Sequence, residues 1–412
     1  MYKRLRLACY TSSCSMSVVG NLPPLLFLTF RAQYGLSFSL LGTLVAVNYV
    51  TQLAIDLVFS FFSHRFNIFK TLKLMPVLTL LGLLCYAAAP VVLPQAVYAG
   101  LLVGTVLFSA AAGLAEVLIS PVIAAIPADD PDREMSKLHS IYAWGTVFVV
   151  IVSTLFLLAF GTASWQWLTL LFALLPLSSA ILFRRAKFPA METPKQNSAA
   201  LALFKKPALW LSFAAIFLGG ASECTMAQWA SGYLEQALGI DKVWGDVFGV
   251  ALFAVMLGTG RTLYASRGRN LGTVLLAGGI GATLCYLVAA ITSAPVVGLI
   301  ACALTGLCTS LLWPGNLVAA TDRFPTGGVF LYALMAAGGD LGASVGPQMI
   351  GMITDAVIAQ PQMLTLAESL SLAPEQLGMK LGMLAAMGFP LISIPVYAAI
   401  RRYRRLNGLE GK

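Results

Sequence analysis

The chain has 412 residues, of which 58% are hydrophobic and only 10% are charged, and its mean hydropathy is +0.84. Water-soluble domains need roughly 25% charged residues to cover their surface, so this composition excludes them and predicts an integral membrane protein. The formal net charge of +9 is interpreted as Lys and Arg retained on one side of a membrane, and no nucleic-acid partner is expected.

Long stretches without Asp, Glu, Lys, Arg or His indicate the membrane-spanning segments. The clearest cover residues 32–55, 74–115, 140–183 and 270–321. About 20 apolar residues cross a bilayer as a helix, and the alternating pattern of β-barrel strands is absent from the sequence. Breaking the runs at charges and at Gly and Pro clusters predicts about twelve helical spans: 8–30, 37–62, 72–91, 95–126, 139–161, 164–183, 207–232, 244–264, 271–292, 295–320, 327–353 and 379–400.

The first span follows the basic residues Lys3, Arg4 and Arg6 and stays apolar up to Phe30. This start resembles a signal peptide, but no small-residue cleavage site follows, so we expect an uncleaved span. Within it, Gly20-Asn21-Leu22-Pro23-Pro24 is predicted to break the helix at mid-depth, because proline cannot donate the helical hydrogen bond. Asn21 is therefore a candidate solute contact.

The second span carries Asn48, Gln52 and Asp56 at positions i, i+4 and i+8, which forms one polar line along a helix. Hydrogen bonding to neighbouring helices alone would explain this line. The functional interpretation is that Asn48 and Gln52 line a solute pathway and that Asp56, nearer one end, belongs to a closing gate.

Three acids lie inside predicted spans: Glu116, Glu223 and Asp340. A charged side chain at the bilayer centre costs about 2.5–3.5 kcal/mol on insertion scales, so such acids normally face the protein interior or a water-filled cavity. All three are candidate proton carriers. Structural roles remain open for each: an acid kept neutral or hydrogen-bonded by a neighbouring helix for Glu116, helix packing around Glu223, and a salt bridge for Asp340.

Aromatic and amide side chains occur together at two further places. Tyr142 with Trp144, and Gln228 with Trp229, could stack on a sugar ring while an amide binds its hydroxyls. Asn316 follows Trp313-Pro314 and is a weaker candidate of the same kind. Trp165 and Trp167 are interpreted as anchors at the membrane interface instead.

A repeated motif divides the chain into two halves. Gly113-Leu114 to Pro121 and Gly306-Leu307 to Pro314 both fit G-L-x-x-x-L-x-x-P, at matching places in the two sets of six spans. We expect duplicated bundles that enclose a central site. The predicted division is a six-helix bundle at 1–183, a cytoplasmic linker at 184–206 and a second six-helix bundle at 207–412.

The basic residues predict the orientation. The 26 Lys and Arg residues fall almost entirely in alternate loops that include both termini, and only Arg31, Lys242 and Lys380 lie on the other side. Because Lys and Arg are retained in the cytoplasm, both termini are expected there.

Catalytic and cofactor patterns are absent from the sequence. No hydrolase triad, metal cluster, phosphate-binding loop or dinucleotide fingerprint occurs, so neither enzyme activity nor a cofactor is expected. The seven cysteines show no metal-binding spacing and are interpreted as reduced packing residues. Without an ATP-binding sequence, uphill transport would draw on an ion gradient or a partner protein.

The chain resembles the major facilitator superfamily over essentially its whole length, and within it the fucose-permease-type sugar:proton symporters and related bacterial transporters. The likeness rests on Asn21 to Phe27, Gly113-Leu114-Ala115-Glu116 with Pro121, Gly219 to Glu223, Gly258-Thr259-Gly260-Arg261 and Gly338-Gly339-Asp340. The superfamily's loop motif after span two keeps only Arg65 and Lys70, with His64 in place of the acid. Arg65 and Arg261 join Asp56 as candidate gate residues.

The resemblance implies a role for Glu116 in substrate or proton handling, and it implies an all-α fold of two pseudo-symmetric six-helix bundles. The first-span acid of fucose permease has no counterpart here. We expect a monomeric, proton-coupled transporter of a sugar or related metabolite in the bacterial inner membrane. Export of amphipathic drugs or lipids is the alternative, and a membrane-embedded enzyme or a receptor stays open.

Overall fold

The structure is a computed structural model that describes residues 2–62, 65–127, 131–189, 203–267, 270–325 and 328–409. This part of the chain is helical and contains no β-strand. Ten stretches of it are long and apolar enough to cross a membrane; a bent helix pair and the shorter apolar segment Trp144–Phe160 account for the remaining predicted spans. The predicted all-α membrane fold is confirmed. His64 and most of the predicted linker lie outside the described residues.

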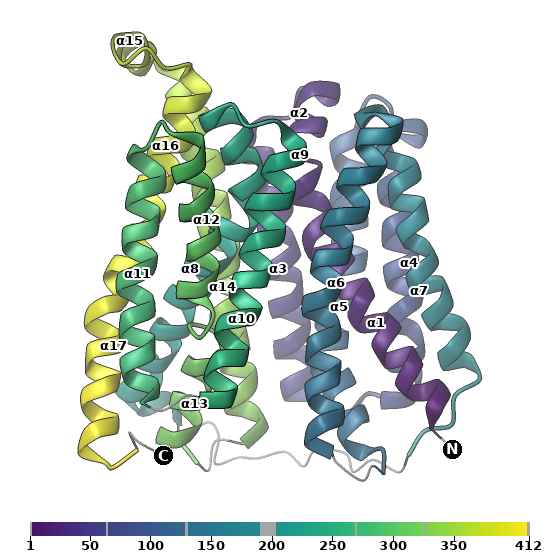
Figure 1. Cartoon of the computed structure of the whole chain (residues 1–412). Helices are drawn as coiled ribbons and strands as arrows, with labels where there is room; N and C mark the ends of the chain where they lie inside the picture. Colours follow the sequence, from purple (N-terminus) through teal and green to yellow (C-terminus); the bar gives the residue numbers. More distant parts are fainter. Residues whose placement is uncertain are drawn as a thin grey trace. The chain divides into compact units, whose positions relative to one another are not determined.

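The chain divides into two compact units, shown with all their helices in Figure 1. Unit 1 consists of Met1–Tyr34 and Val47–Asn197, and unit 2 consists of Gly35–Ala46 and Ser198–Lys412. The boundary therefore falls inside one continuous helix, α3 (Phe38–Phe62), whose first turns group with unit 2. The remaining helices of unit 1 are α1 (Lys3–Leu25), α2 (Phe27–Tyr34), α4 (Ile68–Val92), α5 (Val97–Ala125), α6 (Pro131–Phe160), the 3-10 turn η2 (Thr162–Ser164) and α7 (Trp165–Arg184).

The first helix that lies wholly in unit 2 is α8 (Pro207–Leu238), one of the longest helices, which ends at Gly239 in the left-handed conformation that favours glycine (φ 64°). The other elements of unit 2 are α9 (Lys242–Trp244), the π-helical η4 (Gly245–Ala251), α10 (Leu252–Arg267), α11 (Leu271–Ile291), α12 (Pro295–Thr309), α13 (Pro314–Arg323), α14 (Gly328–Ala359), α15 (Pro361–Ser369), α16 (Pro374–Ala386) and α17 (Gly388–Leu406).

Prolines interrupt two of the spans. Pro23 and Pro24 precede the break at Leu26, where α1 and α2 meet at an angle of 48°. The predicted break in the first span is thereby confirmed. The tenth span was predicted as one helix at 295–320. In the structure α12 ends at Thr309 and α13 begins at Pro314. Proline supplies no N–H and its ring crowds the carbonyl four residues earlier, so the helical ladder stops there.

Several elements differ from their predicted bounds, and the last span, predicted at 379–400, consists of the two helices α16 and α17. The fifth span was predicted from residue 139, whereas α6 begins at Pro131. The bilayer thickness limits how much of a helix is apolar but not how far its polar end continues into water. The short helix α15, between the last two spans, was not predicted, and in Figure 1 it lies at the ends of α14 and α16.

Glycines set the closest helix contacts in both units. In unit 1, Gly82 of α4 and Gly104 of α5 face each other, since a Cβ on either would lie 2.8 Å from the carbonyl oxygen of the other. In unit 2, Gly338, Gly342 and Gly346 of α14 follow one another at intervals of four residues and lie against α8. Lipid tails are as apolar as Leu, so close backbone packing takes over part of the role that the hydrophobic effect has in water.

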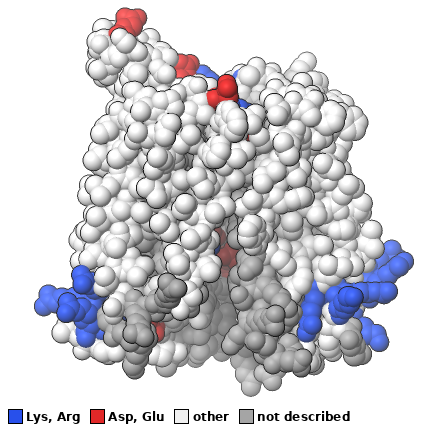
Figure 2. Space-filling view, in the orientation of Figure 1, with Lys and Arg blue, Asp and Glu red and all other residues white. Residues whose placement is uncertain are grey.

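Charged side chains are concentrated away from the middle of the spans. In the view of Figure 2 the Lys and Arg side chains gather at the lower end, while the middle of the molecule shows almost only uncharged residues. This agrees with the basic loops on which the predicted orientation depends. The few acids that remain inside the spans are therefore candidate functional residues.

Candidate transport site

The polar line of the second span joins a polar face of α5 within unit 1. Gln52 donates a hydrogen bond to the Asn48 side-chain oxygen over 3.1 Å, and Ser109 of α5 donates to the same oxygen over 2.5 Å. All three side chains are buried. Gly113 lets the helices approach, because a Cβ there would lie 3.1 Å from the Gln52 carbonyl oxygen. The amides predicted to line a pathway thus form one connected network between α3 and α5.

Glu116 continues this network toward Asp56. Ser109, Gly113 and Glu116 follow at helical spacing, so they share the face of α5 that meets α3. Carboxylate oxygens of Glu116 and Asp56 lie within 4.8 Å of each other. Asp56 is fully buried, whereas Glu116 is exposed. The structure therefore brings together a residue predicted to carry protons and a residue predicted to act as a gate.

The candidates of the first and fifth spans meet at the α1–α6 contact. Asn21 is half-buried and donates to the Ser17 carbonyl over 2.8 Å and to the Thr146 hydroxyl over 3.3 Å. Ser17 in turn donates to the Tyr142 carbonyl over 2.8 Å. Trp144 is 70% exposed and lies on the face of α6 opposite to that contact. Asn21 and Tyr142 are thus near each other, and Trp144 is apart from them.

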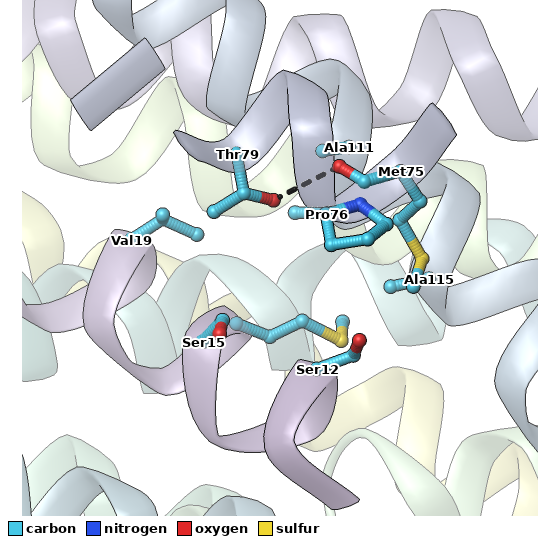
Figure 3. A pocket seen from close by; sticks show the side chains of 10 residues that line it. Ser12, Ser15, Val19, Met75, Pro76, Thr79, Ala111 and Ala115 are labelled. Atoms are coloured by element: carbon cyan, nitrogen blue, oxygen red, sulfur yellow. Dashed lines mark hydrogen bonds between the residues drawn. The ribbon is translucent and has the colours of Figure 1, made fainter. Parts of the chain in front are cut away.

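A small pocket lies between α1, α4 and α5 in unit 1, as Figure 3 shows. Ser12, Ser15 and Thr79 supply its polar side chains, and Met75 and Pro76 border it. Its volume of about 10 Å³ is close to the minimum that one water molecule needs. The pocket is too small for a sugar-sized solute and is not a candidate substrate site.

Unit 2 contains an ion pair inside its membrane-spanning part. The guanidinium of Arg261, on α10, lies 3.0 Å from a carboxylate oxygen of Glu223, on α8, and donates hydrogen bonds to both oxygens. The Glu223 side chain is 12% exposed and that of Arg261 is 40% exposed. The sequence analysis predicted Glu223 as a proton carrier and Arg261 as a gate residue. In the structure the two side chains form an ion pair.

The same arginine also completes the broken tenth span. Its Nε donates a hydrogen bond over 3.0 Å to the carbonyl oxygen of Ser310, four residues before Pro314. Pro314 has no N–H to offer that carbonyl, so the side chain of Arg261 replaces the missing helical donor. Ser310 was not among the predicted site residues. The signal that could have found it is the spacing of four residues before a proline inside a span.

Three further candidates are buried residues of α8 and α14. Trp229 is fully buried and donates from its indole N–H to the Pro347 carbonyl over 2.8 Å, while Gln228 is 6% exposed on the same turn of α8. Asp340 is 2% exposed on α14. The hydrogen bond of Trp229 joins α8 to α14, so this side chain has a structural role.

Asn316 and Arg65 complete the predicted set. Asn316 is buried and its amide donates to the carbonyls of Ala215 and Leu312, over 3.0 and 2.6 Å, and to the Tyr397 hydroxyl over 3.2 Å. It ties α13 to α8 and α17. Arg65 lies in the exposed turn after α3, with its guanidinium 5.6 Å from the ring centre of Phe62.

Comparisons with solved structures show the fold. The chain is similar to a bacterial homolog of the human lysosomal transporter Spinster in its inward-facing and occupied conformation, with 14% identity, a TM-score of 0.72 and coverage of 97% of this chain and 96% of the other. It is similar to a D-xylose-proton symporter at 16% identity and a TM-score of 0.72, covering 94% and 96%. The E. coli fucose:proton symporter matches at 17% identity and a TM-score of 0.57, covering 94% and 98%.

Comparison with models of protein families identifies the family of the chain. A search of the curated proteins finds no match. The family model described as Major Facilitator Superfamily matches residues 8–347, which is most of the chain and includes every intramembrane acid described above. Together with the helical fold, this match means that the chain belongs to the Major Facilitator Superfamily, a family of membrane transporters.

Proposed function

We propose that this transporter is proton-coupled and moves a small polar solute, a sugar or a related metabolite, by alternating access. In such a cycle the binding site opens to one side of the membrane at a time. The observation that carries the proposal is the network between α3 and α5, in which buried amides lead to two carboxyl groups within 4.8 Å of each other. The solved neighbours named as proton symporters of xylose and fucose support the same class of substrate.

Asp56 and Glu116 are the proposed proton carriers. Two unit charges about 5 Å apart repel by about 3 kcal/mol at an effective dielectric constant of 20. A proton held by the pair removes this repulsion and lowers the cost of enclosing the site. Asp56 is fully buried and Glu116 is exposed, so Glu116 is the member that we expect to exchange the proton with water.

Asn48 and Gln52 are the proposed solute contacts in unit 1. Their amides adjoin the carboxyl pair on one face of α3, so a bound solute and a proton would act on the same helix. Gln228 of α8 and Asn21 of α1 stay proposals for further contacts. Glu223 and Asp340 stay proposals for additional proton-linked groups.

We also propose that both termini are cytoplasmic, that the protein resides in a bacterial inner membrane, and that it works as a monomer. The basic residues at one end of the spans support the orientation. Export of amphipathic drugs or lipids is the alternative function, and it would use the same acids with a less polar solute.

Uptake into proteoliposomes tests the proposal. Wild-type protein should accumulate one of a panel of labelled sugars, including D-xylose and L-fucose, when the outside is made acidic. Glu116→Gln should lower proton-driven accumulation by at least about 10-fold, because the glutamine amide cannot accept and release the proton. Glu368→Gln is the matched control, because Glu368 is an exposed acid on α15, outside the spans.

Two results would count against the proposal. If Glu116→Gln kept wild-type accumulation and its pH dependence, the carboxyl pair would not carry the proton. If vesicles expelled lipophilic cations and accumulated no sugar at any pH, the exporter function would replace the proposed one.

A further inference from the structure

The guanidinium of Arg261 is only partly used by its partners in unit 2. Its Nε donates to the Ser310 carbonyl and its Nη2 donates to Glu223. A guanidinium has five N–H donors, and the contacts found among the described residues leave those of Nη1 available. Since the side chain is 40% exposed, a ligand can reach the guanidinium.

The partner of Arg261 can give up its charge. Glu223 is a carboxylate that becomes neutral on taking up one proton, and its side chain is 12% exposed. If an anion bound to Arg261 beside Glu223 without that proton, one negative charge in excess would remain inside the membrane, which is strongly unfavourable. Binding of one anion is therefore linked by charge balance to uptake of one proton at Glu223.

The other charged side chains on the helices around α8 are described by their own contacts and burial. Asp246 of η4 pairs with Lys242 over 3.0 Å, and Lys380 of α16 donates to the Thr292 carbonyl. Asp340 is buried on α14. Among the described residues, Arg261 is the cation that contacts Glu223.

An apolar pocket begins beside the stem of Arg261. It has a volume of about 220 Å³ and is bordered by Tyr264 of α10, Leu271 of α11, Leu311 in the break between α12 and α13, and Pro314 and Val318 of α13. An apolar cavity of about 150 Å³ is enough for benzene. The pocket thus has room for the apolar body of a small ligand whose charged group lies on the arginine.

We infer that the solute of this transporter carries a single carboxylate on a small apolar body, that Arg261 binds the carboxylate, and that Glu223 takes up the proton that keeps the site neutral. The planar fork of arginine matches a carboxylate in a way that lysine does not. The inference rests on the proposed proton-coupled transport and assigns it a monocarboxylate as solute in place of a neutral sugar.

Binding to the purified full chain in detergent provides the test, with benzoate as the probe and benzamide as its neutral match in shape. Titration calorimetry in two buffers of different ionisation enthalpy counts protons taken up with the ligand. We expect benzoate to bind at least about 10-fold more tightly than benzamide, because only the carboxylate gains hydrogen bonds in which both partners are charged. About one proton should be taken up per benzoate.

Variants assign the roles of the two residues. Glu223→Gln should still bind benzoate but without proton uptake, and Arg261→Lys should bind it more weakly. Because Arg261→Gln alone leaves Glu223 unpaired and can unfold the protein, the double variant Glu223→Gln with Arg261→Gln keeps a neutral hydrogen-bonded pair and should lose the preference for benzoate over benzamide. Glu368→Gln should behave as wild type.

The inference is overturned if benzamide binds as tightly as benzoate, or if the double variant keeps the wild-type preference. Its failure is distinguishable from failure of the proposed function. If a neutral sugar is accumulated with protons and benzoate does not bind, only the monocarboxylate inference falls. If neither neutral nor anionic solutes are accumulated in response to a proton gradient, the proposed function falls as well.

Discussion

The carboxylate of Asp355 accepts a hydrogen bond from the backbone N–H of Ser39 over 2.7 Å, and its other oxygen accepts from the N–H of Phe38 over 3.0 Å. The first N–H groups of a helix have no partner within the helix, and an acid at that end also interacts favourably with the helix dipole. An acid near the end of α14 therefore caps the start of α3. The capped residues Phe38 and Ser39 group with unit 2, as Asp355 does, so the cap is a contact within that unit.

Replacing Asp355 by alanine is expected to destabilise the protein by about 0.5–2 kcal/mol, the usual cost of losing a helix cap. The measurement is the thermal midpoint of the purified protein in detergent. Glu368→Ala, on the exposed face of α15, should leave the midpoint unchanged. Equal midpoints for Asp355→Ala and wild type would show that the cap contributes nothing.

Replacing Pro314 by alanine returns an N–H that can pair with the Ser310 carbonyl. We expect α12 and α13 to straighten, Arg261 to lose its contact to that carbonyl, and the transport rate to fall while stability stays equal or rises, since an internal proline costs a helix about 3 kcal/mol. Pro295→Ala is the control, because proline at the first turn of α12 disturbs no helical bond. Unchanged transport by Pro314→Ala would remove any role for the break.

Replacing Asn316 by alanine removes the amide that donates to the carbonyls of Ala215 and Leu312, although the Ala215 carbonyl keeps the Tyr397 hydroxyl as a donor. We expect a loss of about 0.5–1.5 kcal/mol in stability, the usual net contribution of a hydrogen bond. Asn407→Ala, at an exposed position, is the control. If Asn316 only joins helices, the apparent affinity for solute should stay the same. A large loss of affinity at unchanged stability would instead show that Asn316 contacts the solute.

Replacing Gly104 by valine places a Cβ 2.8 Å from the carbonyl oxygen of Gly82 and 3.0 Å from the backbone nitrogen of Tyr86. Backbone atoms cannot move aside like a flexible side chain, so a loss of about 1–3 kcal/mol is expected from overpacking. Gly258→Val is the matched control, because nothing lies within 4 Å of a Cβ at Gly258. The check is the temperature at which each variant aggregates, and similar values for the two variants would contradict the prediction.

Much of the fold follows from the sequence because a bilayer imposes it residue by residue. A charge inside a span is unfavourable whatever its neighbours are, so the spans, their number and the isolation of Glu116, Glu223 and Asp340 could be predicted from composition and spacing. The break after Pro23 and Pro24 was predictable for the same reason, since a proline lacks its N–H in any surroundings.

Only the tertiary structure decided which of these residues meet. Glu116 faces Asp56, and Glu223 pairs with Arg261, because of how neighbouring helices are rotated and shifted along each other. That register depends on close contacts such as Gly113 against the Gln52 carbonyl, which a helical pattern in one segment does not specify. The two copies of the repeated motif show the difference: α5 runs through Pro121 unbroken, whereas the helix before Pro314 ends, and its freed carbonyl is bound by Arg261 from another helix.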